Sequence, residues 1–126
     1  MIDVTCAIIL LGDEVLAVRR ARGMHLAGHW EFPGGKIEPG ETAEDCIIRE
    51  IFEELNIRIR PVEKLIPVEH HYPGKSIRLI PFICDIIKGQ IQLAEHAESR
   101  WVKSSELASL DWATADWKLI EVNGLG

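Results

Sequence analysis

The sequence lacks a long hydrophobic run, an excess of basic residues and any pattern of paired cysteines. Its longest uninterrupted apolar segment is Cys6–Leu11, six residues, whereas a membrane-spanning helix needs about 20. We therefore expect no membrane association. No basic stretch followed by an apolar segment opens the chain, so we expect no secretory signal. The formal charge of −6, from 14 basic and 20 acidic residues, argues against stable nucleic-acid binding, which relies on many Lys and Arg side chains facing phosphates.

The three cysteines, Cys6, Cys46 and Cys84, are odd in number and lie among apolar neighbours. This pattern is typical of reduced core thiols in a cytoplasmic protein. The length of 126 residues fits a single domain over residues 1–126. A composition of 47% hydrophobic and 27% charged residues excludes a disordered tail or a fibre. We expect a monomer or a homodimer.

Hydrophobic alternation and turn residues predict a series of extended segments and three helices. The extended segments are expected at 4–11, 14–20, 30–32, 57–62, 64–71, 76–87 and 100–102. The run Pro33–Gly35 is expected to end the third of these and to begin a loop. The helices are expected from the N-cap Thr42 to Leu55, from a cap at Ser104 to Leu110, and over 115–122. Strands on both sides of a central helix indicate an α/β or α+β sandwich.

The helix that ends at Leu55 carries an unusual cluster of acidic residues. At about 100° per residue, Cys46, Glu50, Glu53 and Glu54 share one face. The opposite arc, expected to pack on the sheet, holds Ile47, Ile48, Ile51, Phe52 and Leu55. Like charges at these spacings repel one another, and a divalent cation would convert that repulsion into coordination. Ligands that are all oxygen indicate Mg²⁺ or Mn²⁺ rather than zinc.

The alternative interpretation is a solvated acidic face on which Arg49 simply pairs with Glu53 at i+4. The loop before the helix argues against it. The pair Gly34-Gly35 is followed by Glu41 and then by the helix. A glycine pair lets the backbone approach a ligand closely and exposes a carbonyl oxygen as a further ligand.

Residues 35–57 resemble the signature of the Nudix family. Gly35 is followed by five residues, then Glu41, then seven residues, then the run Arg49–Ile57. This order matches the family's G, five spacers, E, seven spacers, R-E-U-x-E-E-x-G-U, in which U is a bulky apolar residue. The one departure is Asn56 at the usual glycine, and Asn also ends helices in the left-handed conformation. Segments further along the chain, around 19–35 and 112–116, look like those of MutT-type nucleotide pyrophosphohydrolases.

The resemblance implies the Nudix fold, a mixed β-sheet sandwiched between helices, and roles for matching residues. Glu50, Glu53 and Glu54 would hold Mg²⁺, with the Gly34 carbonyl as an added ligand. Arg49 would orient these carboxylates through its planar fork, and Glu41 would support the loop or the metal site. The residues that correspond to the substrate-binding stretch of MutT-type enzymes are Arg20, His25, Glu31, Phe32, Pro33 and Gly34.

Three roles stay open. The general base that accepts a proton from the attacking water is Glu53, Glu54, or an acid of the segment 95–98. In MutT-type enzymes that acid directly precedes a tryptophan, but here Arg100 precedes Trp101, so Glu95 and Glu98 are both alternatives. Asp116 is either the residue that reads the base through its hydrogen-bonding carboxyl or a helix N-cap. The tryptophans Trp30, Trp112 and Trp117 either stack on a base or belong to the core.

The resemblance implies Mg²⁺-dependent hydrolysis of a nucleoside triphosphate to the monophosphate and pyrophosphate, in nucleotide-pool sanitation. Both a CTP-like substrate and an oxidised purine such as 8-oxo-dGTP are consistent with Asp116. Two other interpretations remain: hydrolysis of another substrate in which a nucleoside diphosphate is linked to a further group, and a non-catalytic nucleotide-binding regulator. The second is less consistent with a signature that retains all four of its acidic residues.

Overall fold

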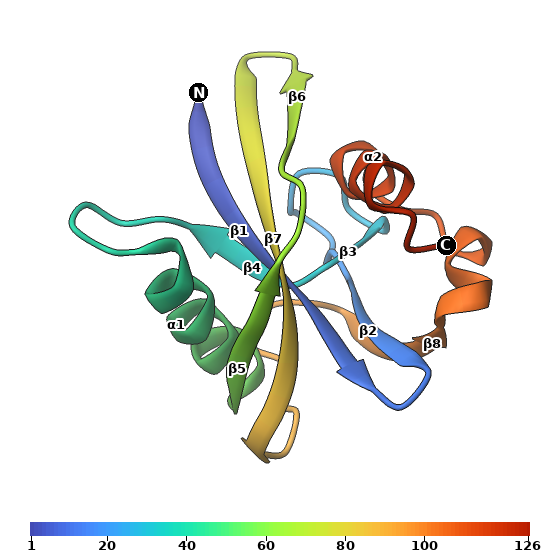
Figure 1. Ribbon diagram of the computed structural model, residues 1–126. Coiled ribbons are helices and arrows are strands. Elements are labelled where there is room, and N and C mark those ends of the chain that lie inside the picture. Colours follow the sequence, from blue (N-terminus) through green and yellow to red (C-terminus); the bar gives the residue numbers. More distant parts are fainter.

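The computed structural model describes residues 1–126 and consists of one mixed sheet with a helix on each side (Figure 1). The strands are β1 (Ile2–Leu11), β2 (Glu14–Arg19), β3 (Trp30–Glu31), β4 (Gly34–Lys36), β5 (Ile57–Lys64), β6 (Val68–Tyr72), β7 (Lys75–Gly89) and β8 (Glu98–Lys103). The helices are α1 (Ala43–Leu55), a 3₁₀ helix (Ser104–Ser109) and α2 (Thr114–Asn123).

The central path of the sheet runs β3-β2-β1-β7-β5. β1 and β7 are parallel, with Ile2 opposite Ile77 and Ile9 opposite Cys84, and the other pairings are antiparallel. β4 pairs with β1, β6 with β7, and β8 with β2. Because β1 lies in the middle of this arrangement, both of its faces are covered, which explains its continuous apolar run.

The sheet separates two hydrophobic cores, and successive residues of β1 alternate between them. Cys6 and Ile8 belong to the core under α2, whereas Ala7 and Ile9 belong to the core under α1. The side chains that α1 contributes are Ile47, Ile51 and Leu55, and those of α2 are Ala115, Leu119 and Ile120. The predicted sandwich of a mixed sheet between helices is therefore confirmed.

The ends of α1 follow the predicted signals. Thr42 is the N-cap, and its Oγ1 accepts a hydrogen bond from the Asp45 backbone N–H at 3.1 Å. Asn56 adopts the left-handed conformation, with φ 59° and ψ 28°, and its N–H donates to the Phe52 carbonyl. The Asn at the family's glycine position thus ends the helix in the way that glycine would.

Several predictions about local structure are wrong. Gly34 and Gly35 do not form a loop but belong to β4, which pairs with β1. Phe52 was expected to pack on the sheet, yet it is 46% exposed, and its ring contacts the Arg58 guanidinium at 5.2 Å. The segment expected over 64–71 forms a strand only from Val68. Ser104 opens a 3₁₀ helix that has no side-chain cap.

Candidate active site

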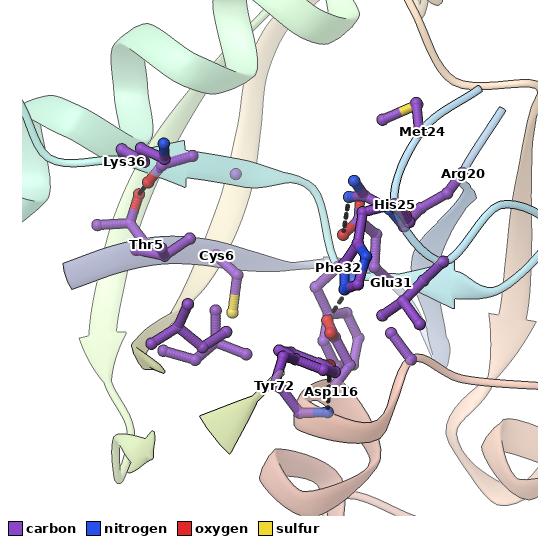
Figure 2. Close-up of a pocket in the computed structure, with 18 of the residues that line it drawn as sticks. Thr5, Cys6, Arg20, Met24, His25, Glu31, Phe32, Lys36, Tyr72 and Asp116 are labelled. Carbon is purple, nitrogen blue, oxygen red and sulfur yellow. Dashed lines mark hydrogen bonds and ion pairs between the residues drawn. The ribbon is translucent and has the colours of Figure 1, made fainter. Parts of the chain in front are cut away.

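A cavity of about 210 Å³ opens between β1, β4, the loop 20–26, the β6–β7 turn and the start of α2 (Figure 2). Most residues that the sequence predicts for substrate binding, together with one acid of α1, line this cavity. They are Arg20, His25, Glu31, Phe32, Gly34, Glu54 and Asp116. The fold thus brings residues from both halves of the chain together at one cavity, to which the acidic helix contributes Glu54.

Arg49 links the acidic residues of the signature to one another. Its Nε and Nη2 donate to the two carboxylate oxygens of Glu41 at 2.7 and 2.9 Å. Its Nη1 lies 2.9 Å from Glu50 Oε1 and 3.3 Å from Glu53 Oε2. The hydrogen bonds from Arg49 lower the pKa of Glu41 to about 2. One guanidinium therefore holds three carboxylates in place, as its planar fork allows.

The two glycines of β4 are required by close packing inside the protein. A Cβ at Gly34 would overlap the Thr5 carbonyl oxygen and lie 2.7 Å from the Cys6 Cα, both in β1. A Cβ at Gly35 would overlap the Glu50 carboxyl group and lie 2.6 Å from its Oε1. The first glycine therefore lets β4 approach β1, and the second leaves room for Glu50 between α1 and β4.

Glu54 is the acid of α1 that lines the cavity. Burial, together with the charges of Glu31 and Glu50, raises its pKa to about 8. Its Oε2 is buried and has no hydrogen-bond partner. Burial also raises the pKa of Glu50, whereas the side chain of Glu53 is 57% exposed. The exposure of the carboxylates thus decreases along the acidic face, from Glu53 beside Arg49 to Glu54 in the cavity.

We tested whether these residues fit a metal ion. No three acidic, histidine or cysteine side chains converge closely enough to form a complete cage. However, the donors on α1 are carboxylate oxygens, and the orphaned Glu54 Oε2 is desolvated without a partner, which a cation would offset. Mg²⁺ characteristically binds one or two carboxylates and takes its remaining ligands from water and substrate phosphates. The residues present therefore fit Mg²⁺.

Glu31 is held at the cavity by two partners. Arg20 Nη1 lies 2.8 and 2.9 Å from its two carboxylate oxygens, and Arg20 Nε also donates to the His25 carbonyl. His96 Nε2 lies 2.7 Å from Glu31 Oε2. No sequence pattern predicts this role for His96, since only the burial that the folded β7–β8 segment creates distinguishes it from a surface histidine.

Asp116 lies in the first turn of α2 and is buried. Its Oδ2 accepts a hydrogen bond from the Phe32 backbone N–H at 2.9 Å. Burial and the charge of Glu31 raise its pKa well above the usual value. The N-cap of α2 is Ala113, so the interpretation of Asp116 as the N-cap is wrong. The Tyr72 hydroxyl instead accepts from the Ala115 N–H at 3.1 Å.

Some predicted site residues lie elsewhere. Glu98 does not line the cavity. Its carboxylate is instead paired with Arg19 and Arg100, each at 3.2 Å. Glu53 and Pro33 also lie outside the cavity lining, and the Pro33 carbonyl accepts from the Ala7 N–H in β1.

The tryptophans do not supply a stacking surface in the cavity. Trp30 and Trp112 are buried in the core under α2, and Trp117 packs at the edge of that core. The Trp112 Nε1 donates to the Leu107 carbonyl at 2.7 Å. None of the three lines the cavity, which favours their interpretation as core residues. No helix has the length and apolar character needed to cross a membrane.

The chain is similar in sequence and fold to several known proteins. The NUDIX domain family model matches residues 1–122. The CTP pyrophosphohydrolase of Escherichia coli K12 is 33% identical over 121 residues, which cover 96% of this chain and 90% of that relative. The 8-oxo-dGTP diphosphatase of the same organism is 32% identical over 108 residues, 86% of this chain and 84% of that relative. The crystal structure of a MutT protein from Methanosarcina mazei superposes with a TM-score of 0.88 at 26% identity, over 98% of this chain and 92% of that one.

Proposed function

The chain belongs to the Nudix family, and on this basis we propose that it hydrolyses nucleoside triphosphates to the monophosphate and pyrophosphate in the presence of Mg²⁺, in nucleotide-pool sanitation. The observation that carries the proposal is the cavity, which joins the desolvated Glu54 of the signature helix to the buried carboxyl of Asp116. Carboxyl groups suited to phosphate chemistry and to base recognition therefore line one cavity.

We assign the metal site to Glu50, Glu53 and Glu54, with the Gly34 carbonyl as a further ligand. Because the three side chains do not converge into one cage, one or two of these carboxylates would bind Mg²⁺ directly and the others through its water ligands. When bound there, Mg²⁺ neutralises phosphate charge and acidifies water. Arg49, through its contacts with Glu41, Glu50 and Glu53, keeps the carboxylates from separating. Preorganised charge of this kind is a large component of catalysis, because no side chain has to reorient during the reaction.

In the reaction, a water oxygen attacks a phosphorus atom, the bond from that phosphorus to its bridging oxygen breaks, and the water loses a proton. Of the four candidates for the proton acceptor, Glu54 alone lines the cavity. Glu53 is paired with Arg49 and Glu98 with two arginines. Glu95 is near enough to Glu54 for its charge to raise the pKa of that residue. We therefore propose that Glu54 accepts the proton of the attacking water, with Glu95 as the alternative.

The base end of the cavity supports a substrate that offers hydrogen-bonding groups to carboxyls. Asp116 and Glu31 both line it, and a carboxyl accepts from an amine when ionised and also donates when protonated. The relatives include one named for CTP and one named for 8-oxo-dGTP at nearly equal identity. Both base classes therefore belong in the assay.

The experiment is a panel of canonical and oxidised nucleoside and deoxynucleoside triphosphates with Mg²⁺, scored by pyrophosphate release and by chromatography of the products. Glu53→Gln and Glu54→Gln are each expected to abolish most turnover while the fold is kept. Glu106→Gln, on the exposed surface of the 3₁₀ helix, is the matched control. Full activity of either variant, or of the wild type in excess EDTA, would refute the proposal. Nucleotide binding without pyrophosphate release would identify a regulator, and cleavage of a different diphosphate would identify another Nudix substrate.

A further inference from the structure

His96 is a buried histidine beside the cavity that the reaction proposed above does not use. It lies between β7 and β8, and its side chain is 3% exposed. Its Nε2 lies 2.7 Å from Glu31 Oε2, whereas its Nδ1 is buried without a partner. Because an ionised carboxylate only accepts hydrogen bonds, Nε2 is the donor. Burying a ring nitrogen without a partner destabilises the fold. The hydrogen bond to Glu31 is therefore the one polar contact of the His96 side chain that offsets its burial.

The contacts of Glu31 leave one oxygen less occupied than the other. A carboxylate offers about four acceptor positions, two on each oxygen. Arg20 uses one position on Oε1 and one on Oε2, at 2.8 and 2.9 Å. His96 uses the second position on Oε2. The remaining acceptor is on Oε1, and Glu31 lines the cavity with a side chain that is only 18% exposed.

Glu31 also stands between the two ends of the cavity. Its charge contributes, after burial, to the raised pKa values of both Glu54 and Asp116. Figure 2 shows Glu31 beside Arg20 and His25, with Asp116 and Tyr72 below them. A free acceptor at this position faces the nucleoside rather than the phosphate groups, since phosphate oxygens are also acceptors and would be repelled.

We propose that His96 is a positioning residue for specificity: together with Arg20 it fixes Glu31 so that Oε1 accepts an N–H or O–H from the nucleoside of the substrate. This inference rests on the proposed function and extends it. The donor belongs either to an exocyclic amine of the base or to a sugar hydroxyl. Substrate pairs that differ either at the amine-bearing edge of the base or at one sugar hydroxyl separate these two sources.

The test compares His96→Met, which removes the donor at nearly constant side-chain length, with His96→Gln, which keeps an N–H at the reach of Nε2. The kcat/KM ratios of CTP to UTP and of ATP to ITP report the exocyclic amine. The ratio of CTP to dCTP reports the 2′-hydroxyl, and the ratio of dCTP to 2′,3′-dideoxy-CTP reports the 3′-hydroxyl. Because a hydrogen bond to a charged group contributes a factor of about 10 or more to affinity, His96→Met is expected to change one class of ratio by that factor, chiefly through KM. His96→Gln is expected to restore it.

A double-mutant cycle with Glu31→Gln shows whether His96 acts through Glu31. In that background His96→Met is expected to cause no further change in the ratio. Loss of activity by the same factor on every substrate, or additive effects of the two substitutions, would overturn the inference. Should His96→Met fail to fold in a thermal melt, His96→Asn, whose amide is too short to reach Glu31, takes its place.

A failure of the proposed function is recognised separately. The same ratios are measured as dissociation constants of α,β-imido nucleotide analogues with Mg²⁺. If the wild type binds these analogues but hydrolyses no triphosphate, the proposed function is wrong, and the binding ratios still decide the role of His96. If the wild type binds none of them, both are overturned.

Discussion

Replacing the two adjacent glycines of β4 one at a time separates folding from catalysis. Gly34→Ala and Gly35→Ala are the same chemical change, yet the new methyl groups meet different neighbours. At Gly34 the neighbours are the Thr5 carbonyl oxygen and the Cys6 Cα, which belong to the backbone of the central strand β1. At Gly35 the neighbour is the Glu50 carboxyl group, the end of a flexible side chain.

The expected magnitudes follow from what can move. Overpacking typically lowers the free energy of unfolding by about 1–3 kcal/mol. Because β1 is paired with both β4 and β7 and cannot shift easily, Gly34→Ala should lower it by about 3 kcal/mol, which corresponds to roughly 10 °C in Tm. Gly35→Ala should cost about 1 kcal/mol, since Glu50 can rotate away. That rotation breaks the 2.9 Å contact of Glu50 with Arg49, and a displacement of about 1 Å at such a group lowers turnover by about 100-fold.

The assays are thermal denaturation and pyrophosphate release under saturating Mg²⁺. Gly12→Ala, at a turn where no atom lies within 4 Å of the new Cβ and φ is +63°, is the control. It should lose about 1 kcal/mol through backbone strain alone and keep full turnover. Wild-type turnover in Gly35→Ala, or wild-type stability in Gly34→Ala, would show that these contacts do not constrain the site as described.

Three further predictions concern pH, packing and specificity. In EDTA the native state keeps the Glu54 carboxyl protonated up to a pKa of about 8, while the unfolded chain releases that proton near 4.5. The contribution of Glu54 to stability should therefore be complete below pH 4.5 and be lost between pH 4.5 and 8; melts at pH 5 and 8 should show this loss in the wild type and much less of it in Glu54→Gln. Ile51→Ala should lower the free energy of unfolding by about 2–5 kcal/mol because Ile51 is fully buried. Phe52→Ala should lower it by less than about 1 kcal/mol because Phe52 is exposed. Denaturant titration measures both, and equal losses would contradict the orientation of α1. Asp116→Asn keeps an acceptor for the Phe32 N–H but removes the acid, and should change the relative kcat/KM values between bases by about 10-fold without a large change in Tm.

The signature helix was predictable because its spacing, its cap and its terminating residue agree. Thr42, Leu55 and Asn56 mark its ends in the sequence as they do in the structure. Phe52 was misplaced because a helical wheel shows the angle of a side chain but not the width of the surface that covers it. The neighbouring strand β5 brings Arg58 over its ring instead of an apolar partner.

β4 could not be predicted, because two consecutive glycines are typical of a turn. The physical reason for these glycines is the absence of space beside β1 and Glu50, and that is known only once the chain is folded. The role of His96 could not be predicted for a similar reason. Its partner Glu31 lies 65 positions earlier, and no local pattern records a hydrogen bond of that separation.

The parallel pairing of β1 with β7 has a consequence for how the protein is made. Residues 2–9 reach their partners at 77–84 only after most of the chain exists, and such distant contacts slow folding because a long loop must close first. The signature emerges early during synthesis, yet the pocket that it serves also needs Asp116, near the C-terminal end. A chain that ends before Asp116 therefore carries the full signature but lacks part of the cavity lining.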